Sequence, residues 1–208
     1  MVNIAVLVSG GGTNLQAILD ASARGEIPNG RICAVISSKA GAYALTRAEQ
    51  AGVPAHVMTR KDYTDAQAYS DALEQFLKEQ NIELVVLAGF MTVLSESFCR
   101  TFENRIINVH PSLIPSFCGD GFYGMRVHEA ALAKGVKVSG ATVHFVNAVT
   151  DGGPIIAQKA VEVCEGDTPE VLQRRIMEQA EWKLLPKAIS DYCDGKLSVT
   201  DGVVHIAK

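Results

Sequence analysis

Two polar side chains stand two residues apart at the end of an apolar run, in the stretch Ile107-Asn108-Val109-His110. In a strand, residues i and i+2 point to the same face, so the Asn108 amide and the His110 imidazole should share one side of a sheet. Together they form a pair of hydrogen-bond donors. Pro111 and Pro115 restrict the loop that follows, and a rigid loop can hold catalytic groups in place. A strand end with an ordinary turn is the alternative interpretation, so the rest of the chain must decide.

A glycine-rich loop follows the first apolar run of the chain. Residues 3–8 predict a strand, residues 9–14 (SGGGTN) a loop, and the apolar spacing from Leu15 a helix. Glycines let backbone N–H groups turn toward a ligand, and the new helix adds its own free N–H groups and positive dipole end. The pattern favours a phosphate monoester. A tight strand-to-helix turn without any ligand is the structural alternative.

A dinucleotide is the other ligand that such a loop could hold. A GxGxxG pattern started at Gly10 places Leu15 where the third glycine should stand. The second predicted strand, residues 32–36, is followed by Ser37-Ser38-Lys39 in place of the acidic residue that would bind a ribose hydroxyl. NAD therefore fits poorly.

The elements that must position these groups alternate between strand and helix. We expect strands at 3–8, 32–36, 55–58, 84–87, 105–109, 138–146 and 155–163, helices from Leu15 and at 43–51, 66–80, 96–102, 127–134 and 168–191, and a terminal hairpin at 196–206. Continuous apolar strands between helices predict an α/β, Rossmann-like fold with a mostly parallel central sheet and helices on both faces. Ligands bind such sheets at the carboxyl ends of the strands, so the glycine loop and the Asn108/His110 pair should face one cleft.

The composition is that of a globular protein, and we expect one domain over residues 1–208. Of the 208 residues, 48% are hydrophobic and 20% charged, and the net charge of -4 provides no basic field for nucleic acid. The N-terminus enters a strand without the features of a signal peptide, and no apolar run reaches the roughly 20 residues of a membrane span. We expect a cytoplasmic protein without nucleic-acid or membrane partners. The cysteines show neither disulfide nor zinc spacing: Cys33, Cys99, Cys118, Cys164 and Cys193.

Four stretches give the chain a close resemblance to a known enzyme family. They are SGGGTN at 9–14, LAGFM at 87–91, NVHPSLIP at 108–115 and DGGP at 151–154. The chain resembles the phosphoribosylglycinamide formyltransferase family of folate-dependent formyltransferases over nearly its whole length. The resemblance implies transfer of a formyl group from 10-formyltetrahydrofolate to the amine of glycinamide ribonucleotide in purine synthesis, without a metal. It also implies that the N-terminal half binds the phosphate and the C-terminal half the folate. The sequence leaves both a monomer and a homodimer open.

The resemblance carries roles to matching positions. It implies a catalytic trio of Asn108, His110 and Asp151. It implies a ribonucleotide site made of Gly12, Thr13, Asn14 and Glu181. Glu181 is matched to the family's acidic residue through the following Pro186, and this match places one extra residue before Glu181 in the last helix. The folate site is implied, largely through backbone contacts, at Met91, Thr92, Val93, Leu94, Asn147, Ala148, Val149 and Thr150, together with Asn108 and Asp151. Ala66 and Thr92 replace basic residues of some relatives, so recognition of the folate glutamate tail stays open.

Formyl transfer gives these residue types a chemical purpose. Attack of an amine on a formyl carbonyl builds negative charge on the carbonyl oxygen, which hydrogen-bond donors such as Asn108 and His110 stabilise. Asp151 is expected to favour the protonated imidazole, fix its orientation and assist proton transfer through water. In a glycine-proline turn it could instead only satisfy turn amides. We expect His144 as a packed histidine beside the site and Trp182 in the core.

Relatives with other acceptors share the trio, which therefore identifies the chemistry more firmly than the acceptor. A methionyl-tRNA formyltransferase would add a C-terminal tRNA-binding domain and a formyltetrahydrofolate hydrolase an N-terminal regulatory domain, and we expect neither. The phosphate-type glycine loop favours the ribonucleotide as acceptor. A non-catalytic nucleotide or folate binder would be expected to have lost one of the trio, whereas all three residues are present.

Overall fold

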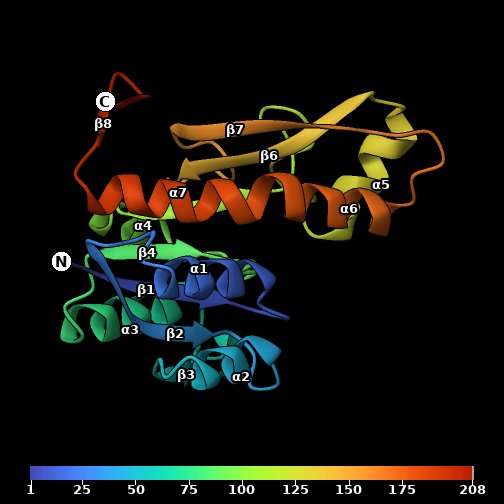
Figure 1. Cartoon of the computed structure of the whole chain (residues 1–208). Coiled ribbons are helices and arrows are strands. Elements are labelled where there is room, and N and C mark those ends of the chain that lie inside the picture. The colour runs from blue at the N-terminus through green and yellow to red at the C-terminus, as the bar shows by residue number, and fades with distance from the viewer. Residues whose placement is uncertain (208) are drawn as a thin grey trace.

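A seven-stranded sheet lies at the centre of the fold (Figure 1). The computed structural model describes residues 1–207. The strand order of the sheet is β3-β2-β1-β4-β5-β6-β7. The strands are β1 Val2–Val8, β2 Gly30–Ser37, β3 Ala55–Val57, β4 Leu84–Leu87, β5 Ile106–His110, β6 Val138–Phe145 and β7 Ile155–Glu162. β1 to β5 pair in parallel, whereas β6 and β7 pair antiparallel. The predicted mostly parallel sheet is confirmed.

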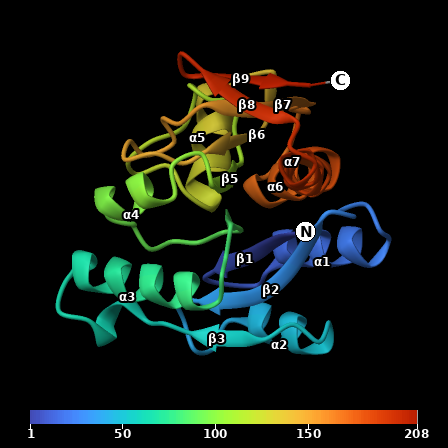
Figure 2. The ribbon, with the colours of Figure 1, turned by 90° about the vertical axis from the view of Figure 1, so that its left-hand side faces the viewer.

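Helices cover both faces of this sheet. They are α1 Thr13–Ala23, α2 Tyr43–Gln50, α3 Ala66–Glu79, α4 Glu96–Thr101, α5 Met125–Lys134, α6 Pro169–Ile176 and α7 Trp182–Cys193, with a 3-10 turn at Arg60–Asp62. Figure 2 shows α3 and α4 on one side and α1, α6 and α7 on the other. Each helix lies within two residues of a predicted one, apart from the last.

The alternation of side chains along β1 divides the core in two. Ile4, Val6 and Val8 belong to the apolar cluster that includes α1 and α7. Ala5 and Leu7 belong to the opposite cluster, with α3 and α4. All five side chains are fully buried, as expected for a strand covered on both faces, and this explains why residues 4–8 of β1 are all apolar.

The last helix differs from the single uninterrupted helix predicted at 168–191. A π-helical segment, Met177–Glu181, separates α6 from α7. A π turn holds more residues than an α turn, so this segment has room for the one extra residue that the resemblance implies before Glu181. Pro186, inside α7, lacks the N–H of a regular helical bond.

The carboxyl ends of β1, β4 and β5 lie side by side at one edge of the sheet. Leu7 pairs with Leu87, and Leu87 pairs with Asn108. The loops after these three strands therefore leave from the same edge, where α/β sheets bind ligands. The expectation that the glycine loop and β5 would share this edge is confirmed, and His110 is itself the last residue of β5.

The chain ends in the predicted hairpin, β8 Leu197–Thr200 and β9 Val203–Ile206, which turns at Asp201-Gly202. Among the helices of residues 1–207, none combines the length and the apolar character needed to cross a membrane.

Candidate active site

Asn108 is held by a histidine of the neighbouring strand. Its Nδ2 lies 3.1 Å from His144 Nε2, and the two residues are directly paired between β5 and β6. His144 Nδ1 lies 2.8 Å from the Phe145 carbonyl oxygen, which can only accept, so Nδ1 carries the hydrogen and Nε2 is free to accept from Asn108. Burial lowers the pKa of His144, which favours this neutral form. The amide orientation of Asn108 is thereby fixed, and its second N–H has no hydrogen-bond partner among residues 1–207.

His110 is buried and contacts the chain through both ring nitrogens. Its Nε2 donates to the Phe117 carbonyl oxygen at 2.8 Å, and its Nδ1 lies 3.5 Å from Asp151 Oδ2. With one proton committed to Phe117, the ring can donate from Nδ1 only as an imidazolium. The Asp151 carboxylate stands beside the nitrogen where that second proton would reside.

Asp151 lies in a tight turn that aims its carboxylate at both histidines. Its backbone is in the left-handed region, at φ 53°. Oδ2 accepts from the Gly119 N–H at 2.9 Å, and Oδ1 lies 3.7 Å from His144 Nε2. A Cβ on Gly153 would stand 1.9 Å from the Phe145 carbonyl oxygen, so this glycine lets the turn close against β6. The three residues predicted as a catalytic trio are thus brought together.

The residues predicted to bind the ribonucleotide also meet. Gly12 caps α1 with φ 74°, and Asn14 Nδ2 donates to Glu181 Oε2 at 2.6 Å. Glu181 is only 5% exposed, and burial raises its pKa to about 7 although the bond from Asn14 opposes that shift. Asn14 Oδ1 is buried and has no partner among the described residues. The loop and the π segment are therefore joined by a buried polar contact, beside which the Asn14 Oδ1 acceptor is unused among the described residues.

The two segments predicted to hold the folate expose apolar side chains. Val93 is 78% exposed in the first segment and Val149 is 65% exposed in the second. Met91 in the first segment is anchored by its N–H, which donates to Ser9 Oγ at 2.8 Å beside the glycine loop. Thr150 in the second donates to Asp120 Oδ1 at 3.2 Å. Both segments are thus tied to the site and leave apolar surface free.

A known protein family matches most of this chain. The family model described as formyl transferase matches residues 2–189. The chain belongs to the formyl transferase family. This formyltransferase is 39% identical over 206 residues to the phosphoribosylglycinamide formyltransferase of Haemophilus influenzae, covering 99% of this chain and 94% of that protein. The resemblance found in the sequence is therefore confirmed, and the chain is an enzyme of this class.

Solved structures share the whole fold of this formyltransferase. Glycinamide ribonucleotide transformylase 1 from Symbiobacterium toebii is 46% identical with a TM-score of 0.94, covering 100% of this chain and 95% of that one. A formyltetrahydrofolate deformylase from Pseudomonas syringae pv. tomato is 25% identical with a TM-score of 0.89, covering 100% of this chain and 66% of that one.

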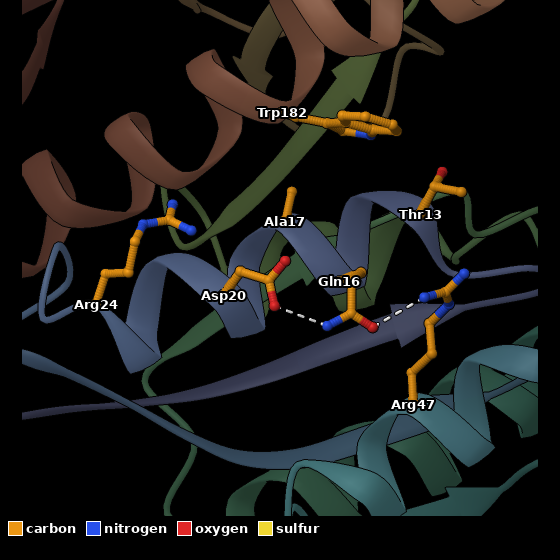
Figure 3. A pocket seen from close by; sticks show the side chains of 7 residues that line it. All are labelled: Thr13, Gln16, Ala17, Asp20, Arg24, Arg47 and Trp182. Carbon is orange, nitrogen blue, oxygen red and sulfur yellow. Dashed lines mark hydrogen bonds between the residues drawn. The ribbon is translucent and has the colours of Figure 1, made fainter.

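A cavity of about 290 Å³ lies beside α1 of the formyltransferase (Figure 3). It is bounded by α1, α2 and α7, and the Trp182 indole lies over Ala17 and Thr13. The prediction of Trp182 in the core is wrong, because these small side chains leave open space beneath the indole and keep it partly exposed.

Two contacts at the site were not foreseen from the sequence. The Phe117 carbonyl binds the His110 ring, and Arg47 of α2 donates to the Gly11 carbonyl oxygen. A backbone carbonyl carries no sequence signal, and an arginine on a short polar helix resembles any solvated residue. Neither contact could be read from local pattern.

Proposed function

We propose that this chain is a phosphoribosylglycinamide formyltransferase. It transfers the formyl group of 10-formyltetrahydrofolate to the amine of N1-(5-phospho-D-ribosyl)glycinamide, in the cytoplasm, as a step of de novo purine (IMP) synthesis. The observation that carries the proposal is the placement of the Asn108, His110 and Asp151 cluster and the glycine loop at one sheet edge. The 39% identity with the Haemophilus influenzae enzyme supports the same acceptor.

The donors at the end of β5 fit the charge that develops during transfer. The substrate amine attacks the formyl carbon, a C–N bond forms, and negative charge builds on the formyl oxygen. The free N–H of Asn108 and the Nδ1–H of protonated His110 donate to that oxygen, and one such donor contributes about 10²–10³ in rate. The bond between the formyl carbon and the folate nitrogen then breaks.

Asp151 assists the proton transfers of this reaction. Its carboxylate lies beside His110 Nδ1 and stabilises the imidazolium. The attacking amine must lose a proton and the leaving folate nitrogen must gain one, and a water held by Asp151 relays it between them. No covalent bond to the enzyme is needed, because both substrates are held in line at one edge.

The two substrates bind to different parts of the chain. Gly12, Thr13 and Asn14 hold the ribonucleotide phosphate with the N–H groups at the start of α1, and Glu181 contacts the ribonucleotide from the π segment. The folate lies against Met91 to Leu94 and Asn147 to Asp151, where the exposed Val93 and Val149 cover its flat rings. Residues 1–208 act as one domain, with the phosphate site in the N-terminal half and the folate site in the C-terminal half.

A formyltetrahydrofolate hydrolase is the second candidate, favoured by the likeness to the Pseudomonas syringae deformylase. Absorbance of the folate product distinguishes the two when purified protein is mixed with 10-formyltetrahydrofolate with and without glycinamide ribonucleotide. Product formed only with the ribonucleotide supports the transferase. Product formed at the same rate without it would make the chain a hydrolase.

A further inference from the structure

Arg47 of α2 is fixed against the glycine loop by three contacts. Its Nε donates to the Gly11 carbonyl oxygen at 2.8 Å, and its Nη1 donates to Gln16 Oε1 at 2.9 Å. Its guanidinium carbon lies 4.9 Å from the centroid of the Tyr43 ring. Figure 3 shows the guanidinium next to Gln16, on the side of the cavity where Thr13 lies. A rigid planar fork held in this way keeps one orientation.

The carbonyl groups of the loop are occupied by α2. The Gly10 carbonyl accepts from the Ala44 N–H at 3.1 Å, and the Gly11 carbonyl accepts from Arg47. In a trans peptide the C=O and the following N–H point in opposite directions, so these contacts turn the next two loop N–H groups away from α2. Oxygens that would repel a phosphate are thus directed away, and the N–H groups that attract it are presented.

Gly12 at the end of the loop packs closely against α2. A Cβ on Gly12 would stand 2.6 Å from Ala44 Cβ and 3.3 Å from Arg47 Cδ. Gly12 also has φ 74°, which disfavours any side chain. The close approach of Gly12 to α2 therefore requires a glycine at this position.

Arg47 also brings a positive charge that forms no direct ion pair with an Asp or Glu among residues 1–207. Within residues 1–207, no Asp or Glu oxygen lies within 4.0 Å of its guanidinium nitrogens. Asp20 lines the same cavity but is linked to Arg47 only through Gln16, whose Nε2 donates to Asp20 Oδ1 at 2.8 Å. By contrast Arg24, also at this cavity, pairs with Glu26 at 2.6 Å.

We propose that Arg47 is a positioning residue for the phosphate of the ribonucleotide. It holds the Gly11 carbonyl so that the loop N–H groups face the phosphate, and its charge strengthens the attraction. This inference rests on the proposed function, because it concerns the acceptor site of that reaction. It assigns a specific part of acceptor binding to α2, away from the formyl group.

Steady-state kinetics of two Arg47 variants tests the inference. Arg47→Met keeps the apolar stem but removes the charge and the bonds, and Arg47→Lys keeps the charge without the fork. The KM for the ribonucleotide should rise about 10- to 100-fold in Arg47→Met and less in Arg47→Lys. The kcat and the KM for the folate should stay within about threefold of wild type. Arg24→Met is the matched control and should change none of the three.

Each outcome decides the role of Arg47. An unchanged ribonucleotide KM in Arg47→Met, or a parallel fall of kcat and both affinities, overturns it and leaves the proposed function standing. Thermal unfolding shows whether Arg47→Met is misfolded. If it is, the ribonucleotide KM of Arg47→Lys, compared with its kcat and folate KM, decides the role of Arg47. Wild-type protein that forms no product dependent on the ribonucleotide overturns the proposed function and this inference together.

Discussion

Asn108 and His144 face each other across β5 and β6, with Asn108 Nδ2 3.1 Å from His144 Nε2. Asn108 is proposed to donate to the formyl oxygen, whereas His144 contacts Asn108 and has no proposed contact with that oxygen. Since His144 Nδ1 is committed to the Phe145 carbonyl, the ring can only accept from Asn108, and it thereby fixes which side of the amide carries the hydrogens. His144 should act through Asn108.

Replacing His144 by leucine should lower kcat about 10-fold with little change in either KM, because the Asn108 amide loses the acceptor that orients it. Steady-state kinetics measures this directly. If His144 acts through Asn108, adding His144→Leu to Asn108→Ala should cost little more than Asn108→Ala alone. Fully multiplicative losses in the double variant would show that the two residues act independently.

Asp151→Asn should reduce kcat by about 10²-fold or more, because the amide cannot relay the amine proton or stabilise the His110 imidazolium. Asparagine tolerates the φ of 53° at this position, so thermal unfolding should stay close to wild type. Asp151→Ala should lose the same activity and also some stability, since alanine is strained in this region. A wild-type kcat in Asp151→Asn would rule out the proposed proton role.

Gly153→Ala should destabilise the fold strongly. The new Cβ would stand 1.9 Å from the Phe145 carbonyl oxygen, a backbone atom that can move only with β6. Overpacking of this kind costs about 1–3 kcal/mol or more, measured by denaturant unfolding. Gly41→Ala is the control, because its Cβ would meet nothing within 4 Å. Equal midpoints for the two variants would refute the close packing of the turn.

Glu181 should make stability depend on pH. Burial raises its pKa to about 7, above its ordinary value of 4.5, so the neutral form stabilises the fold below about pH 4.5 and this stabilisation is lost as the pH rises through 7. Between pH 5 and 8 wild type should lose about 2–3 kcal/mol relative to Glu181→Gln. Chemical denaturation at several pH values measures the difference.

Glu178→Gln is the matched control for that measurement, since Glu178 lies on the same π segment but is exposed. Its stability curve should follow the wild-type curve at every pH. Parallel curves for wild type and Glu181→Gln would mean that Glu181 stays ionised in the folded protein.

Local pattern predicted part of this site well. The alternation of a strand was enough to place Asn108 and His110 on one face, because that relation lies within a single element. The contact between Asn108 and His144, which are 36 residues apart, depends on the register of two strands, which the sequence does not encode locally. The packed position of His144 could be expected, but its partner could not.

The last helices of the chain also contain features that local sequence pattern does not reveal. Apolar spacing predicted one helix over 168–191, but the same spacing does not reveal a π segment inside it. Glu181 was found only by resemblance, and its bond to Asn14 joins residues from opposite ends of the chain. Arg47 carried no signal at all, since its role depends on how α2 packs against the loop.

The fate of the formyl group tests the account most directly. Enzyme in excess is mixed with 10-formyltetrahydrofolate labelled in its formyl carbon and with glycinamide ribonucleotide, and the products of one turnover are separated by mass. The account predicts the label in formylglycinamide ribonucleotide, and its slow appearance in Asn108→Ala and Asp151→Asn. Label recovered as formate, with the ribonucleotide unchanged, would contradict it.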